Sequence, residues 1–136
     1  MDAFEKARVE VERLHDFIAA WFRGELDKDR FEPDFAEVLH PEFENVQPAG
    51  VTLKLDELLN SIQNAHGVNP DFQITIEAPR LLGNWQDLIL FQYIEYQTGA
   101  RASASENRRL STALFEVKDG KLVWRYLTEN GLPLEP

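Results

Sequence analysis

Glu129 is the residue whose type and position best suit proton transfer. It lies near the end of the last segment with a strand pattern, residues 121–130, where its side chain would meet the rim of a cavity. Burial raises the pKa of a carboxyl and a neighbouring cation lowers it, so a carboxylate held by an arginine can serve as a general base. Arg108 and Arg125 are the candidate arginines, and both are candidate ligand-binding residues. The alternative for all three is a salt bridge at the rim, worth about 0 to 1 kcal/mol.

His15 is the second candidate catalytic residue. A histidine ring titrates near neutrality, so it can accept or donate a proton in a pocket. The alternative is a hydrogen-bonded, partly buried side chain, because His15 borders the apolar stripe of a helix predicted over residues 3–24. The other histidines, His40 and His66, lie too far away in the sequence for a metal-binding motif, and the chain has no cysteine. We therefore expect no metal site and no cofactor.

The first half of the chain must supply the helices that cover such a pocket. Apolar residues recur every three or four positions over residues 3–24, which predicts one amphipathic helix. Trp21 lies on that apolar stripe and is a candidate ligand-binding residue. Shorter helices are predicted within residues 27–39, where the residue before Pro41 ends the pattern, and within residues 55–67.

The second half of the chain changes to the alternating pattern of strands. A small, polar stretch at 99–107 predicts a loop, and the strand patterns cover residues 71–79, 88–97, 110–118 and 121–130, in addition to a short strand pattern at 43–47 in the first half. Helices followed by strands predict an α+β fold, in which a curved antiparallel sheet of four or five strands wraps around the N-terminal helices. No linker or repeat interrupts the pattern, so residues 1–136 are expected to form a single domain.

The dipeptide Asp119-Gly120 predicts a two-residue hairpin turn between the last two strands. With that turn, one face of the hairpin carries the rings of Phe115, Trp124 and Tyr126, and the other carries the candidate acid. Aromatic residues are enriched in protein interfaces, so the aromatic face is expected to be the outer one and to form a homodimer. A bulge would move the side chains beyond it to the opposite face.

The strand predicted before that hairpin is apolar on both faces, so its orientation is open. If its aliphatic residues face the helices, Gln92 and Tyr96 line the pocket as ligand-binding residues. Phe91, Tyr93 and Glu95 would then join the outer, aromatic face. The reverse assignment is the alternative.

Composition excludes several classes of partner. The chain of 136 residues carries 24 acidic and 14 basic residues, a formal net charge of −10. Such a surface repels phosphate backbones and anionic lipids, so neither nucleic acid nor a membrane is an expected partner. No apolar run approaches the roughly 20 residues that span a bilayer, and the first residues lack the pattern of a signal peptide. The expected location is the cytoplasm.

The order of three motifs resembles the nuclear-transport-factor-2-like superfamily, which includes ketosteroid isomerases, limonene epoxide hydrolase and polyketide cyclases. The motifs are a long first helix, the segment Leu39-His40-Pro41-Glu42-Phe43, and the terminal Lys118-Asp119-Gly120-Lys121-Leu122-Val123-Trp124-Arg125. The resemblance implies a cone-shaped α+β fold, a pocket between the helices and the concave sheet, and dimerisation through the sheets. Family enzymes often carry a pocket acid on the last strand, which Glu129 can match. The acid–arginine–acid set of the epoxide hydrolases is not evident.

Three functions are consistent with these observations. The first is a small-molecule binding domain whose apolar pocket takes a small apolar or aromatic ligand. The second is an isomerase, cyclase or hydrolase that uses Glu129 and His15 for proton transfer. The third is a dimeric interaction module that uses the aromatic face of the sheet.

Overall fold

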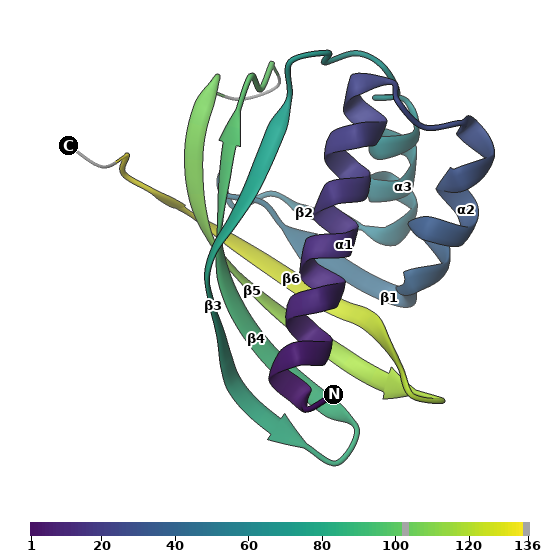
Figure 1. The fold of residues 1–136 in the computed structure, drawn as a ribbon, viewed down its shortest axis with the longest axis vertical. Helices are drawn as coiled ribbons and strands as arrows, with labels where there is room; N and C mark the ends of the chain where they lie inside the picture. Colours follow the sequence, from purple (N-terminus) through teal and green to yellow (C-terminus); the bar gives the residue numbers. More distant parts are fainter. Residues whose placement is uncertain (102–103, 135–136) are drawn as a thin grey trace.

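The helices all cover one face of a six-stranded sheet, which confirms the predicted α+β class (Figure 1). The computed structural model describes residues 1–101 and 104–134, so the loop predicted at 99–107 lies partly outside the described residues. In the sheet the strand order is β2-β1-β6-β5-β4-β3. The elements are α1 (Ala3–Arg23), η1 (Lys28–Arg30), α2 (Phe31–Asp34), η2 (Ala36–Val38), β1 (Leu39–Val46), β2 (Thr52–Lys54), α3 (Leu55–Gln63), β3 (Gln73–Trp85), β4 (Leu88–Thr98), β5 (Glu106–Lys118) and β6 (Lys121–Leu132).

Helix α1 follows the predicted helix closely. Asp2 caps its start by accepting a hydrogen bond from the backbone N–H of Glu5 at 2.9 Å, and Gly24 ends it with a φ of +79°. Its apolar stripe faces the sheet, where Phe4 meets the ring of Phe91 edge-on at 5.7 Å. The helix therefore lies along the concave face and closes it from one side (Figure 1). Within the described residues, none of the helices combines the length and apolar character that crossing a membrane requires.

The helical stretch predicted within residues 27–39 is present but is broken into short pieces. These residues form two 3-10 turns and the single-turn helix α2, and β1 has already begun at Leu39. The pairing of β1 with β6 is interrupted between Leu39 and Glu44, so Pro41 falls where no ladder hydrogen bond is required of it. β2, which no pattern predicted, pairs with the other edge of β1.

The sheet is larger than predicted and is not wholly antiparallel. β3 continues past Pro79 because that residue lies in an irregularity between Glu77 and Arg80. β3 is also an edge strand, where a missing N–H is tolerated. β1 and β6 pair in parallel, whereas the other pairs are antiparallel.

The predicted hairpin turn between β5 and β6 is confirmed. Asp119 and Gly120 have φ values of +52° and +77°, as a type I′ turn requires. Lys118 pairs with Lys121 across it, so the turn has two residues and no bulge. Side-chain pairing near the turn is therefore the predicted one.

A bulge lies farther along the hairpin, at Arg125. Phe115 pairs with Trp124 as predicted, but the next pair is Leu114 with Tyr126, which leaves Arg125 as an extra residue on β6. A bulge of this kind transfers all later side chains of its strand to the other face. Trp124 and Tyr126 consequently lie on opposite faces of the sheet.

Phe115 and Trp124 belong to the core, so the prediction that they form an outer interface is wrong. Both are fully buried, and their rings meet edge-on at 4.6 Å. The indole N–H of Trp124 donates to Glu10 of α1 at 2.8 Å, which shows that the ring lies under the helix. The physical reason is that burial of large rings stabilises the core most. An alternation with apolar residues on both faces does not show which face the helices cover.

The orientation expected for β4 is also wrong. Phe91, Tyr93 and Glu95 are 0 to 4% exposed and face the helices, whereas Gln92 and Tyr96 lie on the outer face. The alternative orientation of this strand is thus the observed one. It brings a carboxylate and a phenol to the concave side.

Candidate functional site: a cavity with a buried row of polar side chains

A cavity of about 570 Å³ lies between the helices and the concave face of the sheet. Its wall is mostly apolar, and the apolar side chains come from α1, α3, β1 and β6 as well as from the connecting segments. They include Leu14, Ile18, Phe22, Phe35, Phe43, Leu58, Ile62, Phe72, Trp124 and Leu127. A cavity of this size and composition is typical of sites for small organic molecules.

His15 and Glu95 form a buried pair at one side of the cavity. The ring Nε2 of His15 lies 3.0 Å from a carboxylate oxygen of Glu95, and both side chains are about 5% exposed or less. The other ring nitrogen, Nδ1, donates to the backbone carbonyl of Val11 at 2.7 Å. The hydroxyl of Tyr93 lies 3.4 Å from Nε2. Both ring nitrogens therefore have acceptors, as a protonated imidazolium requires.

The electrostatics of this pair favour the charged forms. Burial lowers the pKa of His15, but attraction to Glu95 and the hydrogen bond with it outweigh burial and leave the pKa raised. Burial alone would raise the pKa of Glu95, but His15, with a smaller effect from Arg109, holds that pKa below its usual range. The hydroxyl of Tyr93 stays protonated because burial raises its pKa well above the usual value.

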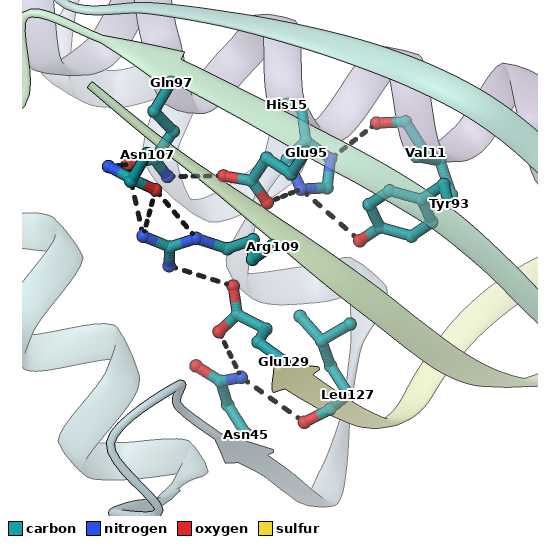
Figure 2. Close-up of polar contacts among 10 residues, drawn as sticks. All are labelled: Val11, His15, Asn45, Tyr93, Glu95, Gln97, Asn107, Arg109, Leu127 and Glu129. Carbon is teal, nitrogen blue, oxygen red and sulfur yellow. Dashed lines mark hydrogen bonds and ion pairs between the residues drawn. The ribbon is translucent and has the colours of Figure 1, made fainter. Parts of the chain in front are cut away.

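A continuous row of hydrogen bonds leads from Glu95 to Arg109 (Figure 2). The amide of Gln97 donates to the second oxygen of Glu95, and its carbonyl oxygen accepts from Asn107 at 3.1 Å. The carbonyl oxygen of Asn107 accepts from Nε and Nη2 of Arg109 at 3.2 and 2.7 Å. The guanidinium is thereby fixed in one orientation on the cavity wall.

Glu129 ends this row. Nη1 of Arg109 donates to one carboxylate oxygen of Glu129 at 3.2 Å, and the amide of Asn45 donates to the other at 3.0 Å. Glu129 is 8% exposed and lines the cavity, so its inward orientation agrees with the prediction. Burial and, after it, repulsion from Glu95 raise its pKa above the usual value despite these two donors. A carboxylate with a raised pKa is a stronger base than an exposed one.

The structure separates Trp21, Gln92 and Tyr96 from the cavity. Trp21 is 1% exposed, stacks with Phe17 and donates from its indole N–H to the carbonyl of Ile62, so it is a core residue. Gln92 donates to Thr112 on the outer face of the sheet. The outward orientation of Gln92 and Tyr96 follows from the strand orientation described above.

Arg108 and Arg125 do not hold Glu129. Arg108 contributes to the cavity wall, but its guanidinium makes an ion pair with Glu77 at 3.5 Å. Arg125 is the bulge residue and pairs with Glu42 and Glu116. Arg109 contacts Glu129 in place of the predicted Arg108. The reason is that the side chains of β5 point to the opposite faces of the sheet from those expected.

Sequence reasoning missed Asn45 and Arg109 and placed Glu95 on the wrong face. Arg109 bonds directly to Glu129 and reaches Glu95 through Gln97 and Asn107. An acid–arginine–acid set, not evident from the sequence, is thus present on one wall. The adjacent pair Arg108-Arg109 was a usable signal, since one member of such a pair on a strand must face inward. No group of three or more His, Asp or Glu side chains suited to a metal ion occurs in the described part of the chain.

Among the comparisons with known proteins, only the comparison with solved structures gives matches. Neither a protein-family model nor a curated protein sequence matches the chain. A nuclear-transport-factor-2-like protein of unknown function from Pseudomonas aeruginosa is 29% identical, with a TM-score of 0.86 over 94% of this chain and 99% of that one. The likeness extends over nearly the full length of both chains.

Two further structures share the fold at lower identity. The CamKII hub homology domain from Chlamydomonas reinhardtii is 15% identical, with a TM-score of 0.75 over 98% of this chain and 100% of that one. A hexachlorocyclohexane dehydrochlorinase from Novosphingobium barchaimii is 17% identical, with a TM-score of 0.66 over 96% and 89%. One fold therefore accommodates an enzyme and a hub homology domain, and it does not by itself specify a function. The resemblance drawn from the motifs is confirmed: the chain has the fold of the nuclear-transport-factor-2-like superfamily.

Proposed function

We propose that this chain binds a small, mostly apolar molecule inside the cavity, with Glu129 and Arg109 as its polar contacts. The observation that carries the proposal is the combination of an apolar cavity of about 570 Å³ with a buried polar row that ends on its wall. Few, well-fixed polar groups in an apolar site are the usual design of small-molecule pockets. A purely structural network would not require an empty space of that size beside it.

Binding can be tested with the neutral fluorescent probe N-phenyl-1-naphthylamine. We expect saturable binding of one probe per chain, with quenching of Trp124, which lines the cavity. Leu127→Trp fills the cavity and is expected to weaken binding by at least about tenfold. Thr128→Trp is the matched control, because the next residue of β6 carries the same bulk on the outer face. Equal binding to both variants, or none to the native chain, would contradict the proposal.

A second candidate function is proton transfer by Glu129, favoured by the burial of its carboxyl and its raised pKa. In this role His15 is a positioning residue, because both of its ring nitrogens contact other groups. The sequence-based assignment of His15 as a catalytic residue therefore becomes a proposal that it acts through Glu95.

The probe reaction for this second function is the elimination of 5-nitrobenzisoxazole. The carboxylate takes the proton from C3, the N–O bond breaks, and 2-cyano-4-nitrophenolate forms. We expect the rate to rise with pH through the raised pKa of Glu129 and to fall by about 10²- to 10⁴-fold in Glu129→Gln. Asp119→Asn, at the exposed hairpin turn, is the control that removes a carboxylate elsewhere. A rate that is equal in the native chain and Glu129→Gln, while the compound still binds, would exclude an accessible base.

Homodimerisation through the sheet also remains a proposal, with a corrected surface. The outer face of β4, β5 and β6 is not covered by any helix of the described residues (Figure 1). Half-buried apolar side chains on this face include Leu90, Ile94, Leu110, Leu114 and Tyr126. Apolar sheet faces of this kind mark interaction sites. Light scattering of the native chain tests the proposal, and a monomer at high concentration would contradict it.

A further inference from the structure

The cavity wall has an open space directly beside Arg109. Gly131 is the residue that pairs with Arg109 across β5 and β6, and it lines the cavity. A Cβ atom added to Gly131 would meet no atom within 4 Å. Its backbone needs no glycine, since its φ is not in the left-handed region. Gly131 is exposed, so this space opens at the mouth of the cavity, and the missing side chain leaves room for a ligand group on the strand face that carries Arg109.

Arg109 keeps one hydrogen-bond donor that the described residues do not use. Its Nε and Nη2 donate to Asn107 and Gln97, whereas Nη1 makes one contact within the described part of the chain, to Glu129. A guanidinium Nη nitrogen carries two hydrogens, so one N–H of Nη1 is left for a ligand. The carboxylate of Glu129 receives Nη1 and the amide of Asn45, and its oxygens keep lone pairs for a further donor. A donor and an acceptor thus lie about one hydrogen bond apart on the wall.

We propose that the polar group of the ligand is a carboxamide or lactam seated over Gly131. The ligand carbonyl accepts from Nη1 of Arg109, and the neighbouring N–H donates to Glu129. An ester lacks the donor for Glu129, and a carboxylate would place a second negative charge against it. A planar amide satisfies both groups at once. This inference rests on the proposed function, since it names the ligand class for the same cavity.

The test compares three naphthalene compounds that share one apolar body. We expect 2-naphthamide to bind the native chain at least about tenfold more tightly than methyl 2-naphthoate, because a buried charged group left unpaired weakens binding strongly. 2-Naphthoate is expected to bind more weakly than the amide at neutral pH. Binding is measured by displacement of N-phenyl-1-naphthylamine.

Two variants test whether Glu129 and the space at Gly131 cause the preference for the amide over the ester. Glu129→Leu removes the acceptor, and Gly131→Val fills the proposed seat while all polar groups stay in place. Both are expected to reduce the amide-to-ester preference to about onefold. Thr128→Val is the control on the outer face, and it should leave the amide-to-ester preference unchanged. If the native chain binds N-phenyl-1-naphthylamine but shows no amide preference, or prefers 2-naphthoate, the ligand class is wrong while the proposed function stands. If the probe itself does not bind, the proposed function fails.

Discussion

Replacing Trp124 with alanine is expected to lower the free energy of unfolding by about 3 to 5 kcal/mol, the range for truncating a buried Trp or Phe. The side chain is fully buried, contacts Phe115 and His15, and donates to Glu10. Its removal would leave a void between α1 and the hairpin. Urea denaturation followed by circular dichroism measures the loss.

Tyr126→Ala is the matched control for that experiment. Tyr126 lies two residues away on β6, but the bulge places it on the outer face. We expect a loss of about 1 kcal/mol or less, as for most substitutions away from the core. Equal losses for the two alanine variants would show that the assignment of faces is wrong.

Glu95→Gln is the second substitution with a large expected effect, a loss of about 3 to 5 kcal/mol, because removing one partner of a buried ion pair leaves the other charge uncompensated. His15 would then be buried beside a neutral amide. Replacing both partners, as His15→Leu with Glu95→Leu, is expected to recover most of the stability, since apolar side chains often substitute well for a buried pair. A double variant no more stable than Glu95→Gln would contradict this.

The size of the Glu95→Gln effect should depend on pH. The pKa of His15 is raised from 6.5, so its contribution is complete below pH 6.5 and is lost as the pH rises through the folded-state value. The pKa of Glu95 is lowered from 4.5, so its contribution is complete above pH 4.5 and is lost in acid. We therefore expect the largest difference between native chain and variant from pH 4.5 to 6.5 and a smaller one at pH 9. The same loss at pH 5.5 and pH 9 would exclude an ionised pair.

Local signals in the sequence were sufficient for α1 and the β5–β6 hairpin. The 3.6-residue periodicity of residues 3–24 and the Asp119-Gly120 dipeptide each act over a few residues, so neither depends on distant contacts. β1 was predictable in part. The alternation of residues 43–47 indicated a strand, but neither its start at Leu39 nor its parallel pairing with β6, more than 80 residues later, had a local signal. β2 has three residues, too few for any alternation to register.

The candidate site was only partly predictable from the sequence. Glu129 was placed inward because two errors cancelled: the faces of the hairpin were reversed, and the bulge at Arg125 moved Glu129 to the other face. Glu95 was assigned to the outer face because β4 is apolar on both sides, and only the helices decide which side is covered. Asn45 has no sequence signal at all, since its role comes from the amide bonds to Glu129 and to the carbonyl of Leu127.

The extra residue at Arg125 makes the polarity of the whole cavity sensitive to chain length. The bulge decides which face of the sheet each later side chain of β6 points to. Deleting one residue there, with no substitution anywhere, would turn Leu127 and Glu129 to the outer face and bring Thr128 and Asn130 inward. The pocket would lose Glu129, Arg109 would lose its direct ion-pair partner, and the outer face would acquire a charge. A change in length at this one point would thus remove one of the two carboxylates from the cavity wall and leave Glu95 alone there.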